Sequence, residues 1–146
     1  MAGFTLFYNN TVTLYNRYFD PETEEEKWYP TVLPNVNLVL TRGANVTKAG
    51  TADADTAKLF VDMKRLPKPY LEPVAWSQLP DEEKARHITF TSAEDFFVEG
   101  DTTTTGIEVA ESGFFELMKQ TRDNVYKVTS TDRYPDILPH FEIGGK

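Results

Sequence analysis

The order of apolar, β-branched and turn-forming residues predicts that the chain opens with a β-hairpin. Residues 11–19 are rich in Thr, Tyr and Val, turn residues follow at 20–24, and β-type residues resume at 27–33. Two such runs around a short polar turn are typical of paired antiparallel strands. Because Pro30 has no N–H to donate, we expect the second strand to lie at a sheet edge or to carry a bulge there.

Six further segments have the composition of strands. In the first, Val36, Leu38 and Leu40 share one face, which is the period-two pattern of a half-buried strand. The six segments are residues 36–41, 57–63, 87–91, 96–99, 126–130 and 141–143. A turn-rich stretch at 132–136 separates the last two.

Two short helices are predicted among these strands. One is predicted at residues 77–86, where a proline and acidic residues come first and basic residues come last. Proline is favoured in the first turn of a helix, and the helix dipole favours acidic residues at the N-terminus and basic residues at the C-terminus. Phe114, Leu117 and Met118 share a helical face, and Ser112 is a suitable cap. Three prolines in 66–74 predict an extended connection. The sum is a mostly β fold, a small β-barrel or sandwich with two short helices and long polar loops.

Two long polar segments interrupt the pattern. Residues 43–55 and 99–111 carry little apolar weight, so they bury little that would offset the entropy of ordering them. We therefore predict that both are mobile loops. The 146 residues otherwise suit one domain, 1–146, with one core.

Charge and composition exclude several classes of function. A net charge of −8 disfavours contact with nucleic-acid phosphate, so we predict no sequence-specific nucleic acid binding. The absence of cysteine excludes disulfides and thiolate metal sites. No run of about 18 apolar residues and no export signal are present, so we predict no membrane contact.

The chain lacks the usual signatures of catalysis. The phosphate-binding patterns GxxxxGK[ST] and GxGxxG and the nucleophile pattern GxSxG do not occur. His87 and His140 are the two histidines, and neither belongs to a recognisable catalytic or metal-ligand motif. We interpret the carboxylates near residues 53–55 and 94–101, Asp95 among them, as solvated rather than metal-binding. We predict no enzyme, and no catalytic, cofactor-binding or metal-binding residue.

The aromatic content of 13% is more than one small core obviously needs. Two hypotheses remain open at this point. The aromatic rings either form a core rich in Phe and Tyr or anchor a protein interface, where Trp and Tyr are enriched. On the second hypothesis, Trp28 and Tyr29 are interface candidates.

Several segments together resemble a known group of proteins. They are TVTLYNRY at 11–18, DPET at 20–23, KWYPTVL at 27–33, YLEPVAW at 70–76, PDEEK at 80–84, ITF at 88–90 and DFFVEG at 95–100. In order and spacing they resemble small proteins encoded in the head-to-tail connector region of tailed phages and Firmicutes prophages. Glu24 departs from the pattern at a turn glycine, and Glu94-Asp95 replaces its Gly-Asp.

The resemblance implies a small β-barrel and a structural virion protein of the head-closure or minor capsid type, which forms or joins a ring through which DNA passes. The implied partners are other connector proteins, on the portal or adaptor side and on the tail-completion side. The implied location is the host cytoplasm during assembly and then the virion. It brings no catalytic residues and no cofactors.

The polar loops and the resemblance together predict how such a ring forms. We expect a homo-oligomer in the virion and a monomer when the protein is free, because the loops lack the apolar weight to order alone. The loop residues that we expect at the interface are Asn45, Val46, Thr47, Thr103, Thr104 and Ile107.

Two other functions remain open from the sequence. The first is a small-ligand or carbohydrate-binding β-barrel whose pocket is lined by the aromatic rings. The second is a carboxylate-dependent hydrolase, which is supported by the abundance of Asp and Glu alone.

Overall fold

The computed structural model of the chain describes residues 8–41, 46–47, 50–51, 56–103, 108–110 and 113–146. About half of these residues lie in antiparallel strands and far fewer lie in helices, which confirms the predicted mostly β class. The strands are β1 (Asn10–Asp20), β2 (Glu25–Thr41), β3 (Val46–Thr47), β4 (Gly50–Thr51), β5 (Thr56–Asp62), β6 (Phe96–Glu99), β7 (Glu108–Ala110), β8 (Val125–Tyr134) and β9 (His140–Gly145). The helices are the 3-10 turn η1 (Met63–Arg65) and the α-helices α2 (Pro73–Ser77), α3 (Asp81–Arg86) and α4 (Phe114–Thr121).

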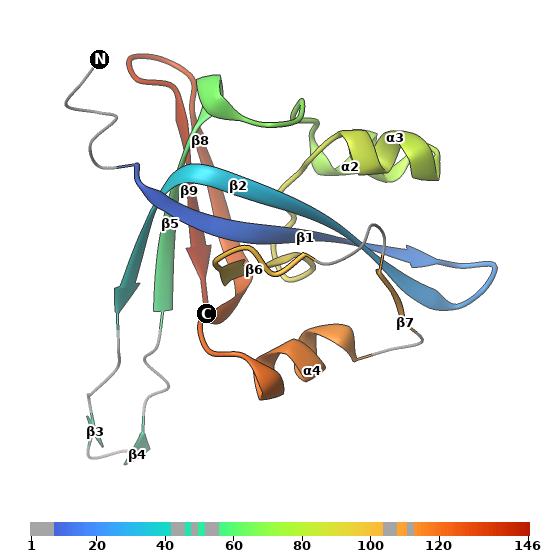
Figure 1. Cartoon of the computed structure of the whole chain (residues 1–146), viewed down its shortest axis with the longest axis horizontal. Coiled ribbons are helices and arrows are strands. Elements are labelled where there is room, and N and C mark those ends of the chain that lie inside the picture. Colours follow the sequence, from blue (N-terminus) through green and yellow to red (C-terminus); the bar gives the residue numbers. More distant parts are fainter. Residues whose placement is uncertain (1–7, 42–45, 48–49, 52–55, 104–107, 111–112) are drawn as a thin grey trace.

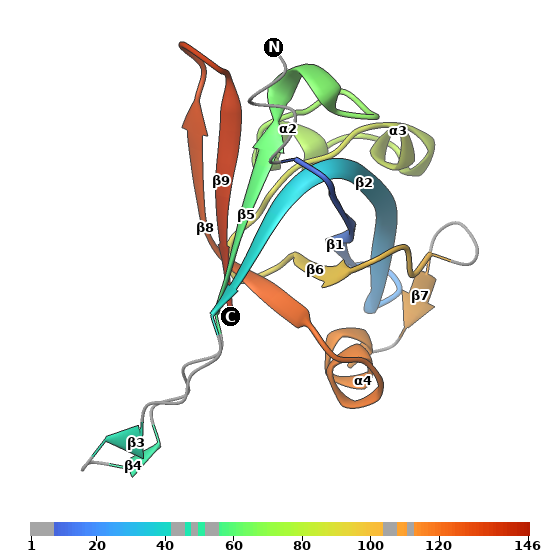
Figure 2. The ribbon, with the colours of Figure 1, turned by 60° about the vertical axis from the view of Figure 1, so that its left-hand side comes forward.

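Six of the strands close into a barrel-like strand ring. Their order is β1-β6-β8-β9-β5-β2, and β2 pairs back with β1, so that each strand has two neighbours. β7 adds to the outer end of β2, and β3 and β4 form a separate two-stranded ribbon. Figures 1 and 2 show the strand ring from two sides, and Figure 1 shows the β1–β2 hairpin extending beyond it.

β2 is one bent strand where the sequence pattern predicts two strands divided at Pro34. Its first part pairs with β1 and its last part, 36–41, pairs with β5. Asn35 makes the change of partner possible, because its φ of 58° is in the left-handed region and produces a bulge. Among the described residues, Pro30 has β1 as its one strand neighbour, as expected for an edge.

The core has two parts that lie on opposite faces of β6. Phe97 points into the strand ring with Leu14, Leu59, Ile143 and other buried apolar residues. Its neighbours Phe96 and Val98 point outward and are covered by α4, which contributes Met118. Because successive side chains of a strand alternate between faces, burial on both faces explains the unbroken apolar run 96–98.

Three other expectations from the sequence are corrected. The segment 87–91 is not a strand, because Ile88 alone forms a bridge, with Tyr70. The predicted helix 77–86 is divided, since Pro80 caps α3 and disfavours helix in the residue before it. The turn predicted at 132–136 begins later, at 135, because β8 continues to Tyr134.

The polar segment 43–55 lies largely outside the described residues, and the polar segment 99–111 lies partly outside them. Within 43–55, the described backbone forms β3 and β4. Within 99–111, the described residues are 99–103 and 108–110, which include the last residue of β6 and all of β7. The mobility of these segments stays a prediction.

Candidate interaction grooves

A short turn at residues 91–95 is the centre of the candidate site. It follows the irregular segment after α3 and leads directly into β6. Ala93 donates its N–H to the carbonyl oxygen of Val128 at 2.8 Å, and Val128 donates to that of Asp95 at 2.9 Å. These two bonds attach the turn to β8.

The carboxylate of Asp95 fixes the turn from inside. It is fully buried, which corrects its interpretation as a solvated carboxylate. Its Oδ1 accepts from the N–H of Arg17 at 2.9 Å, and its Oδ2 accepts from the N–H of Thr91 at 2.7 Å and from Nδ2 of Asn16 at 2.9 Å. Asn16 also donates to the Thr89 carbonyl oxygen at 2.6 Å. The Asp95 side chain thus connects β1 to the turn, and the Asn16 side chain connects β1 to the segment before the turn.

Burial has a strong effect on the acidity of this group. It raises the pKa of Asp95 to about 7, although the three hydrogen bonds oppose the rise by favouring the charged form. All three donors point at the carboxylate from within the fold. The arrangement therefore serves to hold the turn.

The raised pKa predicts an unusual pH dependence of stability. Between about pH 4 and pH 7 the folded chain retains the Asp95 proton and the unfolded chain releases it, so the free energy of unfolding falls as pH rises. His140 acts in the same direction near pH 7: burial lowers its pKa, but hydrogen bonds with Glu142 and the Leu138 carbonyl outweigh burial and raise it. Asp20 and Asp81 have lowered pKa values, so the stability that they contribute is lost as pH falls below about 4.

Urea unfolding at pH 5, 6 and 7 measures this dependence. We expect wild type to gain stability from pH 7 to pH 5, and Asp95→Asn to gain less, with the remaining slope due to His140. An identical slope in the two proteins would contradict the assignment.

The first groove lies on one side of the turn and is called here the aromatic groove. It has a volume of about 290 Å³. Its walls are the end of β1, helix α2 and the turn, and the lining residues include Arg17, Tyr18, Phe19, Val74, Trp76 and Glu94. Phe19 and Val74 are exposed, whereas Trp76 is buried. The groove therefore presents an apolar surface.

Polar contacts, partly buried and partly exposed, hold the walls of the aromatic groove in place. Arg17 forms ion pairs with Glu26 at 2.6 Å and with Glu94 at 2.9 Å, which link β1, β2 and the turn. Trp76 donates its ring N–H to the carbonyl oxygen of Lys84 at 3.2 Å. The Lys84 ammonium lies 4.0 Å from the centre of the Tyr18 ring, and burial lowers its pKa.

The second groove lies on the other side of the turn and is called here the lysine groove. It has a volume of about 450 Å³. Its lining residues include Ala93, Phe115, Lys119, Lys127, Val128 and Lys146. Phe115 and Lys119 come from α4, and Lys127 and Val128 come from β8. The described residues that line it include no carboxylate side chain, so it is a basic site in an acidic protein.

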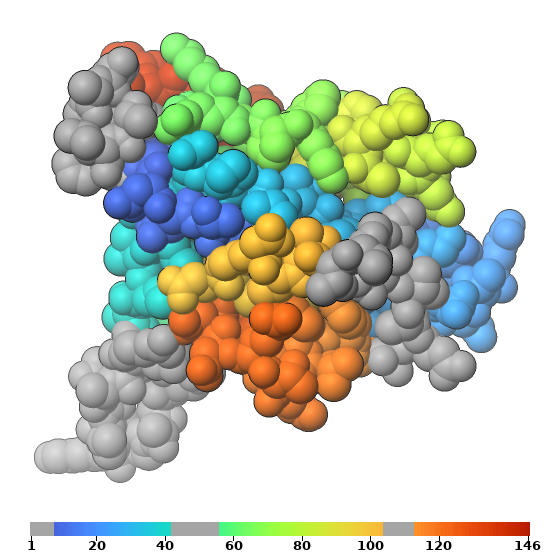
Figure 3. Space-filling view, in the orientation of Figure 1, coloured from blue at the N-terminus to red at the C-terminus, as the bar shows by residue number. Residues whose placement is uncertain are grey.

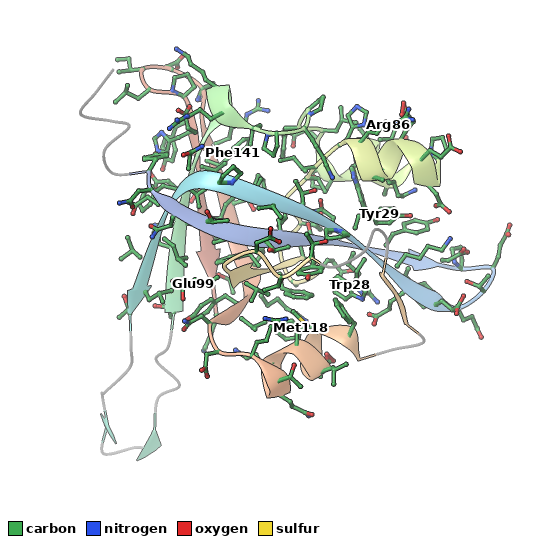
Figure 4. All side chains as sticks on the ribbon, viewed as in Figure 1. Trp28, Tyr29, Arg86, Glu99, Met118 and Phe141 are labelled. Carbon is green, nitrogen blue, oxygen red and sulfur yellow. The ribbon has the colours of Figure 1, made fainter. Side chains whose placement is uncertain are left out.

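Trp28 and Tyr29, the interface candidates on β2, are both buried, with 1% of each side chain exposed. Trp28 packs edge-on against Phe96, with ring centres 5.0 Å apart, and Figure 4 places it with Met118 beneath the hairpin. Tyr29 faces the opposite way, where it packs on Trp76 and donates to Asp81 at 3.0 Å. Both side chains pack in the chain's own core, so neither presents a contact surface to a partner in this conformation.

The loop candidates are only partly within the described residues. Asn45, Thr104 and Ile107 lie outside them. Val46 and Thr47 form β3 and pair with β4. Thr103 donates its N–H to Oδ1 of Asp101 at 3.2 Å. Their interface role stays a prediction.

Two other kinds of site are absent from the described residues. No group of three or more His, Asp or Glu side chains in the described part of the chain is arranged to hold a metal ion. No helix in the same part is long and apolar enough to cross a membrane.

Comparison with known proteins gives one match. No curated protein and no solved structure matches the chain. The model of a family of unknown function, DUF6751, matches residues 7–146. This match spans the strand ring, the helices and both grooves. The chain therefore belongs to the DUF6751 family.

Proposed function

We propose that the chain is a structural subunit of the head-to-tail connector of a tailed phage or prophage, and not an enzyme. It forms or joins an oligomeric ring through which DNA passes, and it binds other connector proteins on the portal or adaptor side and on the tail-completion side. The observation that carries this proposal is the contrast between a filled interior and a grooved exterior.

The interior of the strand ring is occupied by the protein's own side chains. Phe97, Phe141 and Leu59 meet there, each with at most 1% of its side chain exposed. Figure 4 labels Phe141 near the upper end of β8 and β9. A barrel that binds a ligand within its strands needs a cavity in that place. The surplus of aromatic residues is explained largely by the two core clusters.

The exterior has features that suit contact with other proteins. The aromatic and lysine grooves lie on either side of one rigid turn, and the β1–β2 hairpin projects from the body, as Figure 3 shows. A subunit with several distinct contact surfaces can meet both a copy of itself and a neighbouring component. The net charge of −8 suits a wall past which DNA slides, because carboxylates repel phosphate.

The test is to mix the purified chain with the products of the adjacent genes. Light scattering is expected to show stable association, and a titration with duplex DNA at physiological salt is expected to show little binding. Tight duplex binding, or no association with either neighbouring product, would contradict the proposal.

The aromatic groove supports one alternative, a module that binds a small ligand or carbohydrate. Tyr18, Phe19 and Trp76 line it beside the Arg17–Glu94 ion pair, and apolar rings with a few polar groups are typical of such sites. A panel of soluble glycans added during thermal melting separates the two functions. A saturable rise in melting temperature, lost in Phe19→Ala, would favour the alternative.

A further inference from the structure

We infer that the lysine groove of one subunit receives the acidic tip of the β1–β2 hairpin of a second copy of this chain. The tip is defined as residues 20–25. The inference rests on the proposed function, because it identifies the contact between like subunits in the oligomeric ring. It is carried by the chemistry of the groove, the chemistry of the tip and their separation on the molecule.

The groove combines apolar surface with the positive charge of Lys119 and Lys127. The Lys127 ammonium lies 4.4 Å from the centre of the Phe115 ring. The Lys119 ammonium donates to the carbonyl oxygen of Val125 at 3.0 Å, and this leaves further N–H donors on the same group. Among the described residues, neither lysine forms a salt bridge. A partner for this groove is an anionic group with an apolar neighbour.

The hairpin tip has the complementary composition. Pro21, Glu22 and Glu24 are exposed, and Phe19 beside them is 44% exposed. The Asp20 side chain is engaged within the tip, where its Oδ1 accepts from the N–H of Glu22 at 2.9 Å. Glu22 and Glu24 therefore carry the negative charges that are available to a partner. Pro21 and Phe19 supply the apolar contact.

The backbone of the tip is well defined by hydrogen bonds. Glu24 donates its N–H to the carbonyl oxygen of Asp20 at 2.8 Å, which closes the turn. Its φ of 59° is in the left-handed region, where glycine is the favourable residue. The chain thus carries a glutamate at a position where its own stability favours glycine, which is consistent with a use for the carboxylate outside the fold.

A subunit does not reach its own groove with this tip. The β1–β2 ladder runs in continuous register from Val12↔Leu33 to Asp20↔Glu25, so the hairpin is a stiff arm. Figures 1 and 3 show the tip projecting at one end of the molecule, away from α4 and the end of β9 beside which the groove lies. The contact is therefore between two copies, and it joins unlike surfaces.

A contact between unlike surfaces repeats from copy to copy. Such an arrangement closes into a ring when the rotation between copies allows it, and otherwise continues as a filament. The charge pairs lie at the rim of a shallow groove, so the attraction is screened as salt rises. We expect the contact to be weak in the isolated chain and to be reinforced by neighbouring connector proteins.

The absence of native cysteine allows a direct test by disulfide trapping. One preparation carries Glu24→Cys, and a second of different tag length carries Lys127→Cys. The two are mixed with the adjacent connector protein and oxidised. We expect a disulfide between the two preparations, and we expect its yield to fall at high salt. Lys64→Cys, an exposed lysine on η1, is the matched control and is expected to give at least about tenfold less product.

A charge swap tests the same contact without a covalent bond. Lys127→Glu and Glu24→Lys are each expected to weaken self-association by at least about tenfold, and their combination in one chain to restore part of it. Lys64→Glu makes the same charge change elsewhere and is expected to have little effect. Glu24→Gly is expected to raise the urea midpoint while weakening association, which a purely structural role of Glu24 does not produce.

Each other outcome overturns the inference in a recognisable way. Equal trapping with Lys64→Cys, or rings that form normally with Lys127→Glu, would remove the tip–groove contact and leave the proposed connector function standing. Loss of DNA binding in Lys127→Glu, with association unchanged, would make the groove a nucleic-acid site instead. A wild-type chain that associates neither with itself nor with the adjacent protein would remove both proposals.

Discussion

Replacement of Asp95 by alanine is expected to lower the free energy of unfolding by about 3 kcal/mol or more. The substitution removes the acceptor of three hydrogen bonds, whose donors are the N–H groups of Arg17 and Thr91 and the amide of Asn16. The site is fully buried, so water does not readily replace the lost partner. A buried donor without an acceptor costs about 1–3 kcal/mol, and this change leaves several.

The neighbouring residue provides the control for this prediction. Glu94 precedes Asp95 and pairs with Arg17, but its side chain is 47% exposed, so Glu94→Ala is expected to cost less than about 1 kcal/mol. Urea unfolding at pH 7 compares the three proteins. Equal and small losses in the two variants would mean that Asp95 does not hold the turn.

Replacement of Trp28 by alanine is expected to lower the free energy of unfolding by about 3–5 kcal/mol. The side chain is 1% exposed and packs between β6 and α4, with its ring centre 5.0 Å from that of Phe96 and 5.7 Å from that of Phe114. Truncation removes apolar contacts on both sides and leaves a cavity. Calorimetry or urea unfolding measures the loss.

Two further variants separate packing from other effects of the tryptophan. The Nε1 of Trp28 has no hydrogen-bond partner among the described residues, so Trp28→Phe sacrifices no bond and is expected to cost less than Trp28→Ala. Phe19→Ala truncates an exposed ring and is expected to change stability by about 0.5 kcal/mol. A Trp28→Ala protein as stable as Phe19→Ala would show that the outer core cluster contributes little.

The sequence was informative where burial alternates regularly and where turns are local. The strands β5 and β9 follow from such alternation, because each presents apolar residues to the strand ring at every second position. The β1–β2 hairpin follows from the local turn between its two strands. The helix α4 follows from its apolar face at Phe114 and Met118. These features depend on neighbours in sequence.

Features that depend on distant contacts were missed. The β-type segment 87–91 is irregular because it lies against the Asn16 and Asp95 network, which no local pattern specifies. Asp95 resembles its solvated neighbours in composition, and its position directly before the apolar run 96–98 was the one available signal of burial.

The grooves were missed for the same reason. The lysine groove joins α4 to β8, and the aromatic groove joins β1 to α2, so neither exists until the strand ring has closed. Lys119 and Lys127 are ordinary surface lysines in the sequence, and their shared position depends on how α4 packs on Phe96 and Val98.

The most direct measurement of the central claim is the copy number of this chain in assembled particles. Particles of the phage or induced prophage that encodes it are purified, and quantitative mass spectrometry compares the chain with the portal protein. The account predicts that several copies remain in each particle, in a fixed ratio to the portal. A chain that is abundant in the producing cells but absent from purified particles would contradict it.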